Sequence, residues 1–170
     1  MIQAADIIYV GGGNTLKMMR RWRHLGVDKL LARARRQGTV LCGISAGANC
    51  WFAQGSSDSM KFYRPENWDY IRVRGLGFLP GVCCPHYHGE RREQSFARMI
   101  ETRGGVGIAL NDCTALQVDG DRFRVLTSNT RGRAYRILRG RGGVTSERLP
   151  ADRRFRPLKL LFDPDRDLTP

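Results

Sequence analysis

The sequence contains no apolar run that reaches the length of about 18 residues at which a membrane-spanning helix is suspected. Its first six residues also lack the basic region and the apolar stretch of a secretory signal peptide. Hydrophobic residues nevertheless make up 41% of the 170 residues, which is typical of a folded globular protein. We therefore expect a cytoplasmic protein with a buried core.

Metal-binding and disulfide patterns are missing as well. None of the five cysteines forms a Cys-x-x-Cys pair, and the chain has only three histidines. The five cysteines are at positions 42, 50, 83, 84 and 113, and most of them lie in apolar stretches. We interpret them as reduced thiols of the core, and we expect no disulfide, no metal ion and no other cofactor.

Neither of the common nucleotide-binding fingerprints is present. Residues 5–10 predict a strand, which is followed by Gly11-Gly12-Gly13-Asn14-Thr15. This segment has no Gly-Lys-Ser/Thr ending and no Gly-x-Gly-x-x-Gly spacing. Two interpretations stay open. The segment is either a tight turn capped by Asn14 or Thr15, or a loop that offers a backbone N–H to an oxyanion.

Acidic residues are scarce: 16 stand against 29 basic residues, which gives a net charge of +13. Arginine supplies 25 of the 29, in clusters spread over the chain at residues 20–23, 33–36, 131–141 and 153–156. Nucleic-acid-binding proteins usually gather their basic residues on one stripe with exposed aromatic side chains. We expect no specific nucleic-acid partner, only weak and salt-sensitive attraction to polyanions.

The order of the predicted elements indicates an α/β fold. Short apolar segments predict strands at residues 5–10, 39–42, 81–84, 106–110 and 134–139. Helical spacing predicts helices at 16–24, 27–36, 46–53 and 90–103, and a hairpin is expected at 115–126 around Asp119-Gly120. Residues 54–69 read as a loop and 151–170 as a peripheral or partly disordered tail. This alternation implies a three-layer α/β/α domain with a mostly parallel sheet over residues 1–145, followed by a peripheral segment over 146–170.

The densest motif is Gly43-Ile44-Ser45-Ala46-Gly47, between a predicted strand and a predicted helix. A serine between glycines at such a turn is the pattern of a nucleophile elbow, in which small neighbours let the strained turn expose the hydroxyl. The helix N-terminus that follows would stabilise an oxyanion. The alternative is that Ser45 only caps a helix after a glycine-rich turn.

Two more polar residues follow the ends of predicted strands. His86 comes just after residues 81–84, and Asp112 just after residues 106–110. Because parallel strands end at one edge of a sheet, we expect Ser45, His86 and Asp112 to meet there as nucleophile, general base and orienting acid. His88 is the rival base.

Taken together, these motifs resemble the peptidase E family of aspartyl dipeptidases, which is related to cyanophycinase. The resemblance spans residues 4–126 and is carried by five segments: Gly11-Gly12-Gly13-Asn14-Thr15, Gly43-Ile44-Ser45-Ala46-Gly47-Ala48-Asn49, Pro85-His86-Tyr87, Gly89-Glu90-Arg91-Arg92-Glu93 and Leu110-Asn111-Asp112. It implies a class I glutamine-amidotransferase-like, flavodoxin-like fold. It also implies a serine exopeptidase that needs no metal and hydrolyses dipeptides or short peptides with an N-terminal aspartate.

The resemblance also implies a role for individual residues. Ser45, His86 and Asp112 match the catalytic triad, and Gly13 and Ala46 match the donors of the oxyanion hole. Arg92 resembles the arginine that binds the aspartyl carboxylate, which a planar guanidinium suits; the adjacent Arg91 fits a solvated charge better. Asn14 is expected to line the substrate pocket, and Asp58 to lie near the substrate amine.

The sequence departs from the family pattern in two places. Family members usually carry further strands and helices before the segment that matches residues 5–10, so the expected domain is N-terminally short and a homodimer would cover its exposed edges. The loop between His86 and Arg92 is also short. Two alternatives therefore remain: a cyanophycinase-like serine hydrolase that acts on β-aspartyl peptides, and an inactive or truncated homologue.

Overall fold

The computed structural model describes residues 1–140 and 142–165. The chain divides into two compact units, Met1–Leu79 and Pro80–Pro170, which are described here one at a time. Each unit contains a pair of parallel strands together with helices, so the predicted α/β class is confirmed. The boundary between the units lies after Leu79.

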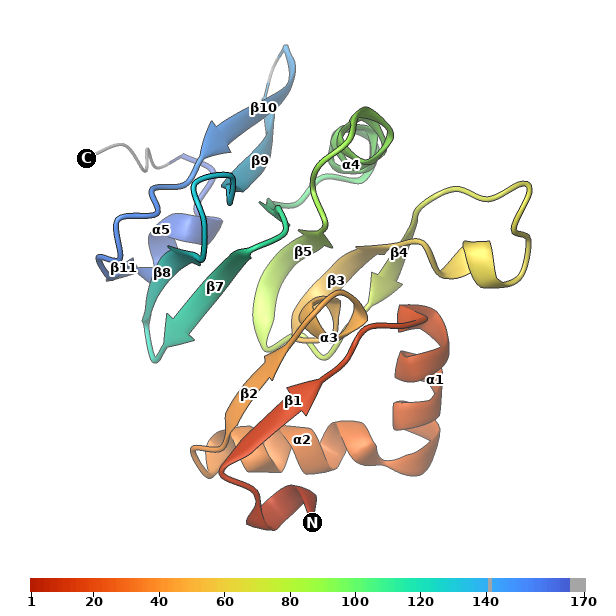
Figure 1. The fold of residues 1–170 in the computed structure, drawn as a ribbon, viewed down its shortest axis with the longest axis vertical. Coiled ribbons are helices and arrows are strands. Elements are labelled where there is room, and N and C mark those ends of the chain that lie inside the picture. The colour runs from red at the N-terminus through yellow and green to blue at the C-terminus, as the bar shows by residue number, and fades with distance from the viewer. Residues whose placement is uncertain (141, 166–170) are drawn as a thin grey trace. The chain divides into compact units, whose positions relative to one another are not determined.

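The first unit is built on two parallel strands (Figure 1). The register pairs Ile7 with Val40 and Val10 with Gly43, so both strands end at the same edge. A second, antiparallel pair joins β3 to β4. The elements of this unit are, in chain order, η1 (Ile2–Ala4), β1 (Ile7–Val10), α1 (Thr15–Leu25), α2 (Val27–Arg36), β2 (Val40–Gly43), α3 (Ala46–Asn49), β3 (Phe52–Ser57), η2 (Ser59–Phe62) and β4 (Ile71–Arg74).

Local signals set the bounds of α1 and α2. The Asn14 side chain caps α1 by accepting a hydrogen bond from the Lys17 N–H at 2.9 Å. Gly26 ends α1 with a φ of 73°, a left-handed conformation that glycine adopts without cost, and α2 starts at the next residue. The predicted break between two helices at Gly26 is therefore confirmed.

The second unit contains a four-stranded array in the order β10-β9-β6-β5, in which β5 and β6 are parallel (Figure 1). Strand β9 pairs antiparallel with β6, and β10 pairs with β9. Strands β7 and β8 form a separate hairpin that turns at Gly120. The short strand β11 pairs antiparallel with β8. The elements are β5 (Leu79–Pro85), α4 (Glu90–Arg103), β6 (Gly107–Leu110), β7 (Thr114–Asp119), β8 (Arg122–Thr127), β9 (Ala134–Gly140), β10 (Gly143–Arg148), β11 (Arg156–Pro157) and α5 (Leu158–Phe162).

Two predictions around the serine motif are wrong. The expected helix over residues 46–53 is only α3, a single turn, and the expected loop over 54–69 begins with strand β3 and includes η2. Asn49 redirects the chain, because its side-chain amide donates to the Ser56 carbonyl at 3.1 Å. Gly55 leaves the necessary space, since a Cβ there would lie 2.5 Å from the Asn49 Oδ1.

The described part of the expected tail is also not peripheral. Residues 151–165 contain β11 and α5, and the α5 residue Leu161 is fully buried. Arg136 of β9, also fully buried, donates to the carbonyls of Leu160 and Asp163 at 2.7 and 2.9 Å. Its Nε donates to Glu147 at 2.8 Å, so one guanidinium joins the end of α5 to β9 and β10.

All five cysteines carry free thiols. Cys50, Cys83 and Cys84 are buried, as expected for core thiols, and burial raises the pKa of Cys50 well above its usual range. Cys113 differs from the expectation because it is exposed. Of the helices in residues 1–140 and 142–165, none combines the length and the hydropathy that crossing a bilayer requires.

Candidate functional site

Ser45 occupies the turn that joins β2 to α3, and its backbone is strained. Its φ of 56° and ψ of −113° lie outside the regions that residues with a side chain normally adopt. The turn is held in place because the Ile44 N–H donates to the Val10 carbonyl at 3.1 Å and the Asn49 N–H to the Ser45 carbonyl at 3.0 Å. This geometry is what the nucleophile-elbow interpretation predicts.

The glycines around Ser45 are required by close packing. A Cβ at Gly43 would lie 2.5 Å from the Gly47 carbonyl oxygen, and a Cβ at Gly47 would collide with the Val10 carbonyl. The backbone of α3 therefore sits directly against the end of β1. Only glycine at both positions allows the strand-to-helix turn to close this tightly.

The glycine loop after β1 approaches the serine side chain. A Cβ built on Gly12 would lie 3.4 Å from the Ser45 Cβ and 3.8 Å from its Oγ. The sequence singled out Gly13, which follows with a φ of 142°; the contact of Gly12 with Ser45 was missed. No sequence signal separates three consecutive glycines, because the register of a loop depends on the strands around it.

Asn14 and Asp58 are brought to the same end of α1. The Asn14 Nδ2 donates to the Ser59 carbonyl at 3.2 Å, and the Leu16 N–H donates to the Ser59 Oγ at 3.0 Å. Asp58 directly precedes Ser59 and is half-buried. Ser59 is fully buried and was not predicted, although it holds two of the predicted residues near each other.

His86 lies one residue beyond the end of β5 in the second unit. Its φ of 54° is left-handed, which is rare for a residue with a side chain. The next residue fixes this conformation: the Tyr87 N–H donates to the Leu110 carbonyl at 2.9 Å. The Tyr87 ring is buried against Phe96 and Tyr135, and its burial raises the pKa of Tyr87 to about 12, with a smaller contribution from Glu93.

The structure brings His86 and Asp112 together. The His86 Nδ1 and the Asp112 Oδ1 are 2.6 Å apart, a short hydrogen bond across the ends of the parallel strands β5 and β6. The second carboxylate oxygen of Asp112 lies 3.4 Å from the His88 Nε2. His88, the alternative base, is therefore a second neighbour of this carboxylate.

Arg92 and Arg91 differ in the way the sequence suggested. Both lie in the first turn of α4, but Arg92 is only 9% exposed whereas Arg91 is exposed. A buried guanidinium makes stronger contacts with a carboxylate than a solvated one, because fewer waters compete with the ligand. This contrast favours Arg92 over Arg91 as the recognition residue.

The predicted site residues are thus distributed over both units. The first unit holds Ser45, Gly13, Ala46, Asn14 and Asp58, and the second holds His86, Asp112 and Arg92. Within residues 1–140 and 142–165, no group of three or more His, Cys, Asp or Glu side chains could hold a metal ion.

The protein has an α/β fold with polar residues just after its strands. Ser45 follows β2, and the hydrogen-bonded His86 and Asp112 follow β5 and β6. The model of peptidase family S51 matches residues 1–126, well over half of the chain. The chain belongs to peptidase family S51, and the predicted resemblance to peptidase E is confirmed.

Individual relatives agree with this assignment. An uncharacterized peptidase of Bacillus subtilis, YgaJ, is 36% identical over 152 residues, which cover 88% of this chain and 63% of the relative. Peptidase E of Streptomyces coelicolor is 28% identical over 131 residues, which cover 71% of this chain and 52% of that protein. The chain thus spans between half and two-thirds of the length of these two relatives.

Solved structures of similar fold are also peptidases by description. A peptidase from an acI-B1 Actinobacterium matches with a TM-score of 0.55 and 17% identity, over 92% of this chain and 61% of that one. A Listeria monocytogenes protein described as a peptidase E matches with a TM-score of 0.58 and 18% identity, over 75% and 62%. At such identities the likeness concerns the fold alone.

Proposed function

We propose that this chain is a serine exopeptidase that hydrolyses dipeptides and short peptides with an N-terminal aspartate. The observation that carries the proposal is the pair of strained strand ends. Ser45 and His86 both have a positive φ, and His86 holds a 2.6 Å hydrogen bond to Asp112. Strain of this kind persists only where surrounding structure enforces it, and it is concentrated at functional sites.

In the proposed reaction the Ser45 hydroxyl attacks the carbonyl carbon of the N-terminal aspartyl residue. His86 takes the hydroxyl proton through its Nε2, since its Nδ1 is engaged with Asp112. His86 then gives this proton to the leaving amine as the C–N bond breaks. A water molecule repeats the sequence on the aspartyl ester and releases aspartate and free Ser45.

The developing oxyanion needs two hydrogen-bond donors, for which we propose the backbone N–H groups of Gly13 and Ala46. Neither N–H donates to another residue in the described part of the chain. A Cβ built on Gly12 would lie 3.8 Å from the Ser45 Oγ, so the same loop is close to the reacting oxygen. Donors that are aimed in advance at the site of developing charge supply the largest electrostatic part of such catalysis.

We assign recognition of the N-terminal aspartate to side chains whose charges are opposite to those of its carboxylate and its amine. Arg92 is proposed to bind the side-chain carboxylate, for which its burial is favourable. Asp58 is proposed to attract the free amine, and Asn14 to line the pocket beside it, because Ser59 keeps the two residues at one end of α1.

The proposal is tested with a panel of peptides and the Ser45→Ala variant. We expect the wild-type chain to cleave Asp-Leu and an Asp-linked chromophore, and to cleave Asn-Leu, Leu-Leu and β-Asp-Arg much more slowly. Ser45→Ala should lower kcat for Asp-Leu by a factor on the order of 10⁴ to 10⁶ while the circular dichroism spectrum stays unchanged.

Three results would contradict the proposal. Activity of Ser45→Ala within about tenfold of wild type would exclude a serine mechanism. Faster cleavage of β-Asp-Arg than of Asp-Leu would favour the cyanophycinase-like alternative. No cleavage of any peptide by the folded chain would favour an inactive homologue.

A further inference from the structure

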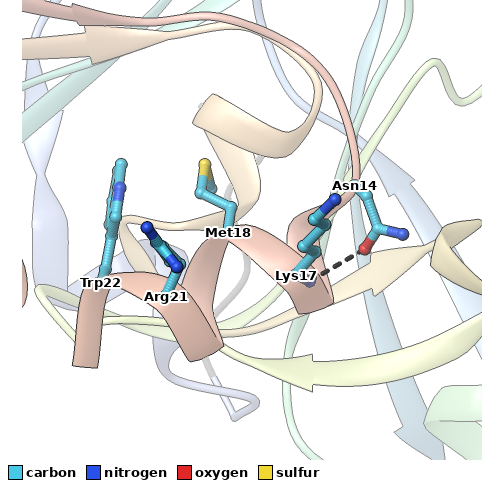
Figure 2. Close-up of a pocket in the computed structure, with 5 residues that line it drawn as sticks. All are labelled: Asn14, Lys17, Met18, Arg21 and Trp22. Atoms are coloured by element: carbon cyan, nitrogen blue, oxygen red, sulfur yellow. Dashed lines mark hydrogen bonds between the residues drawn. The ribbon is translucent and has the colours of Figure 1, made fainter. Parts of the chain in front are cut away.

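One face of α1 forms a pocket in which only Asn14 has a role in the proposed function. The pocket has a volume of about 540 Å³ and is lined by Asn14, Lys17, Met18, Arg21 and Trp22. Four of these side chains rise from the same side of the helix, and Asn14 stands beside Lys17 at its N-terminal end (Figure 2). We call this hollow the α1 pocket.

The lining of the α1 pocket carries two positive charges and no negative one. Helix α1 contains no acidic residue, and Lys17 and Arg21 lie one turn apart on the same face. Two like charges at this spacing destabilise an isolated helix. Within residues 1–140 and 142–165, neither side chain has a hydrogen-bond or ion-pair partner. Such a pair attracts an anionic ligand.

The remaining lining makes the pocket suitable for an organic anion. Met18 and Trp22 are half-buried, so they offer apolar surface between and beside the two cations. An inorganic anion would gain nothing from this surface, whereas the apolar side chain of a peptide would bury itself there. The chemistry therefore fits a carboxylate attached to an apolar residue.

One lining residue of the pocket, Asn14, adjoins the glycine loop that follows β1. Asn14 directly follows the glycine loop, in which a Cβ built on Gly12 would lie 3.4 Å from the Ser45 Cβ. Along the helix axis, Lys17 is about 4.5 Å and Arg21 about 10 Å beyond Asn14, at a rise of about 1.5 Å per residue. An extended dipeptide spans about 7 Å. This length falls between the axial rises from Asn14 to Lys17 and from Asn14 to Arg21.

We propose that Lys17 and Arg21 bind the free C-terminal carboxylate of the peptide leaving group, and thereby select short peptides. This inference rests on the proposed function, in which Arg92 already accounts for the aspartyl side-chain carboxylate. An Asp-X dipeptide carries a second carboxylate, and the α1 pocket supplies the cations for it. Met18 and Trp22 contact the side chain of X, which favours apolar leaving residues.

The test measures binding and not turnover, so that it does not depend on catalysis. Isothermal titration calorimetry of the Ser45→Ala protein compares Asp-Leu with Asp-Leu amide, which lacks the C-terminal charge. We expect Asp-Leu to bind about five- to twentyfold more tightly at low salt. The preference should shrink in 0.5 M NaCl, and it should fall below about twofold when Lys17→Met and Arg21→Met are added together.

Arg20→Met, added to the same Ser45→Ala protein, is the matched control, because Arg20 is an exposed cation of α1 that does not line the pocket. It should keep the full preference for the free carboxylate. Thermal melts verify that each variant is folded, and Lys17→Gln with Arg21→Gln replaces the Met pair if that pair unfolds the protein. A ten-residue oligothymidylate serves as the competing polyanion.

Three outcomes would overturn the inference: equal binding of Asp-Leu and its amide, a preference that survives the double substitution, or an equal loss in Arg20→Met. Tighter binding of the oligothymidylate, lost in the same double variant, would instead make the pocket a nucleic-acid site. Cleavage of Asp-Leu amide at the rate of Asp-Leu would leave the proposed function standing. Conversely, carboxylate-dependent binding without any Ser45-dependent cleavage would support the inference about the α1 pocket and contradict the proposed function.

Discussion

At the scale of single residues, Asp112 is the point where two histidines meet. Its carboxylate holds the His86 Nδ1 at 2.6 Å and contacts the His88 Nε2 at 3.4 Å. In the proposed mechanism the first contact orients the general base, whereas the second only restrains the carboxylate from its other side. Both histidines are at least one-third exposed, so neither contact gains strength from burial.

Replacement of the two histidines should therefore have unequal effects. His86→Ala should lower kcat for Asp-Leu by a factor on the order of 10⁴, because the proton acceptor is lost. His88→Ala should lower it by no more than about fivefold, which is the value of an exposed charge contact. Steady-state kinetics at one pH compare the two variants. The reverse ranking would assign the general base to His88.

Arg92 sets the substrate class in the proposed function. Arg92→Met should lower kcat/KM for Asp-Leu by roughly 30-fold to several thousandfold, since a buried carboxylate partner is worth about 2–5 kcal/mol. The selectivity for Asp-Leu over Asn-Leu should fall in the same variant. Arg92→Lys should recover only part of the loss, because an ammonium lacks the two-pronged geometry of a guanidinium.

Arg91→Met provides the control for Arg92, since Arg91 is exposed at the neighbouring position. Its kcat/KM should stay within about twofold of wild type. If Arg92→Met retained the full preference for Asp-Leu, another group would have to recognise the aspartyl carboxylate. The Ser45 mechanism would survive that result.

At the scale of elements, the packing of α3 against β1 depends on Gly47. In Gly47→Ala the new methyl group would collide with the Val10 carbonyl, and backbone cannot yield as a flexible side chain can. We expect a loss of at least about 1–3 kcal/mol in the free energy of unfolding, measured by urea denaturation. Gly140→Ala is the control, because its Cβ would lie 3.6 Å from the nearest atom. Equal stability of the two variants would contradict this packing.

The elements that the sequence predicted correctly are those with local signals. Helix α4 has the predicted bounds, and α1 and α2 separate at Gly26 as expected, because amphipathic spacing and caps act within a few residues. Strand β3 was missed. Its segment Phe52–Ser57 contains glycine and two serines, which disfavour strands, and its extended form depends on pairing with β4.

The same distinction applies to the site. The strained turn at Ser45 was predictable from the small residues around it, and the placement of His86 and Asp112 followed from their positions at strand ends. The roles of Ser59 and Gly12 were not predictable, because each depends on contact with a distant segment. Helix α5 was missed for a similar reason, since the buried Arg136 anchors it from β9.

At the scale of the whole molecule, the first unit exposes several large apolar side chains. Ile7 and Tyr9 of β1 are 64% and 65% exposed, and Val40 of β2 is 56% exposed. Because side chains alternate along a strand and Ile7 pairs with Val40, these three share one face of the β1–β2 pair. An apolar face of this kind favours association with another surface, and the homodimer stays a prediction.

The proposed function depends on His86 as the general base for Ser45. The most direct test is covalent labelling with an excess of a fluorophosphonate, which reacts with an activated serine, followed by mass spectrometry of the digested protein. We expect one adduct, on Ser45, that is absent from Ser45→Ala and forms at least about 100-fold more slowly in His86→Ala. An adduct on another residue, or labelling of Ser45 at the same rate without His86, would contradict the proposed function.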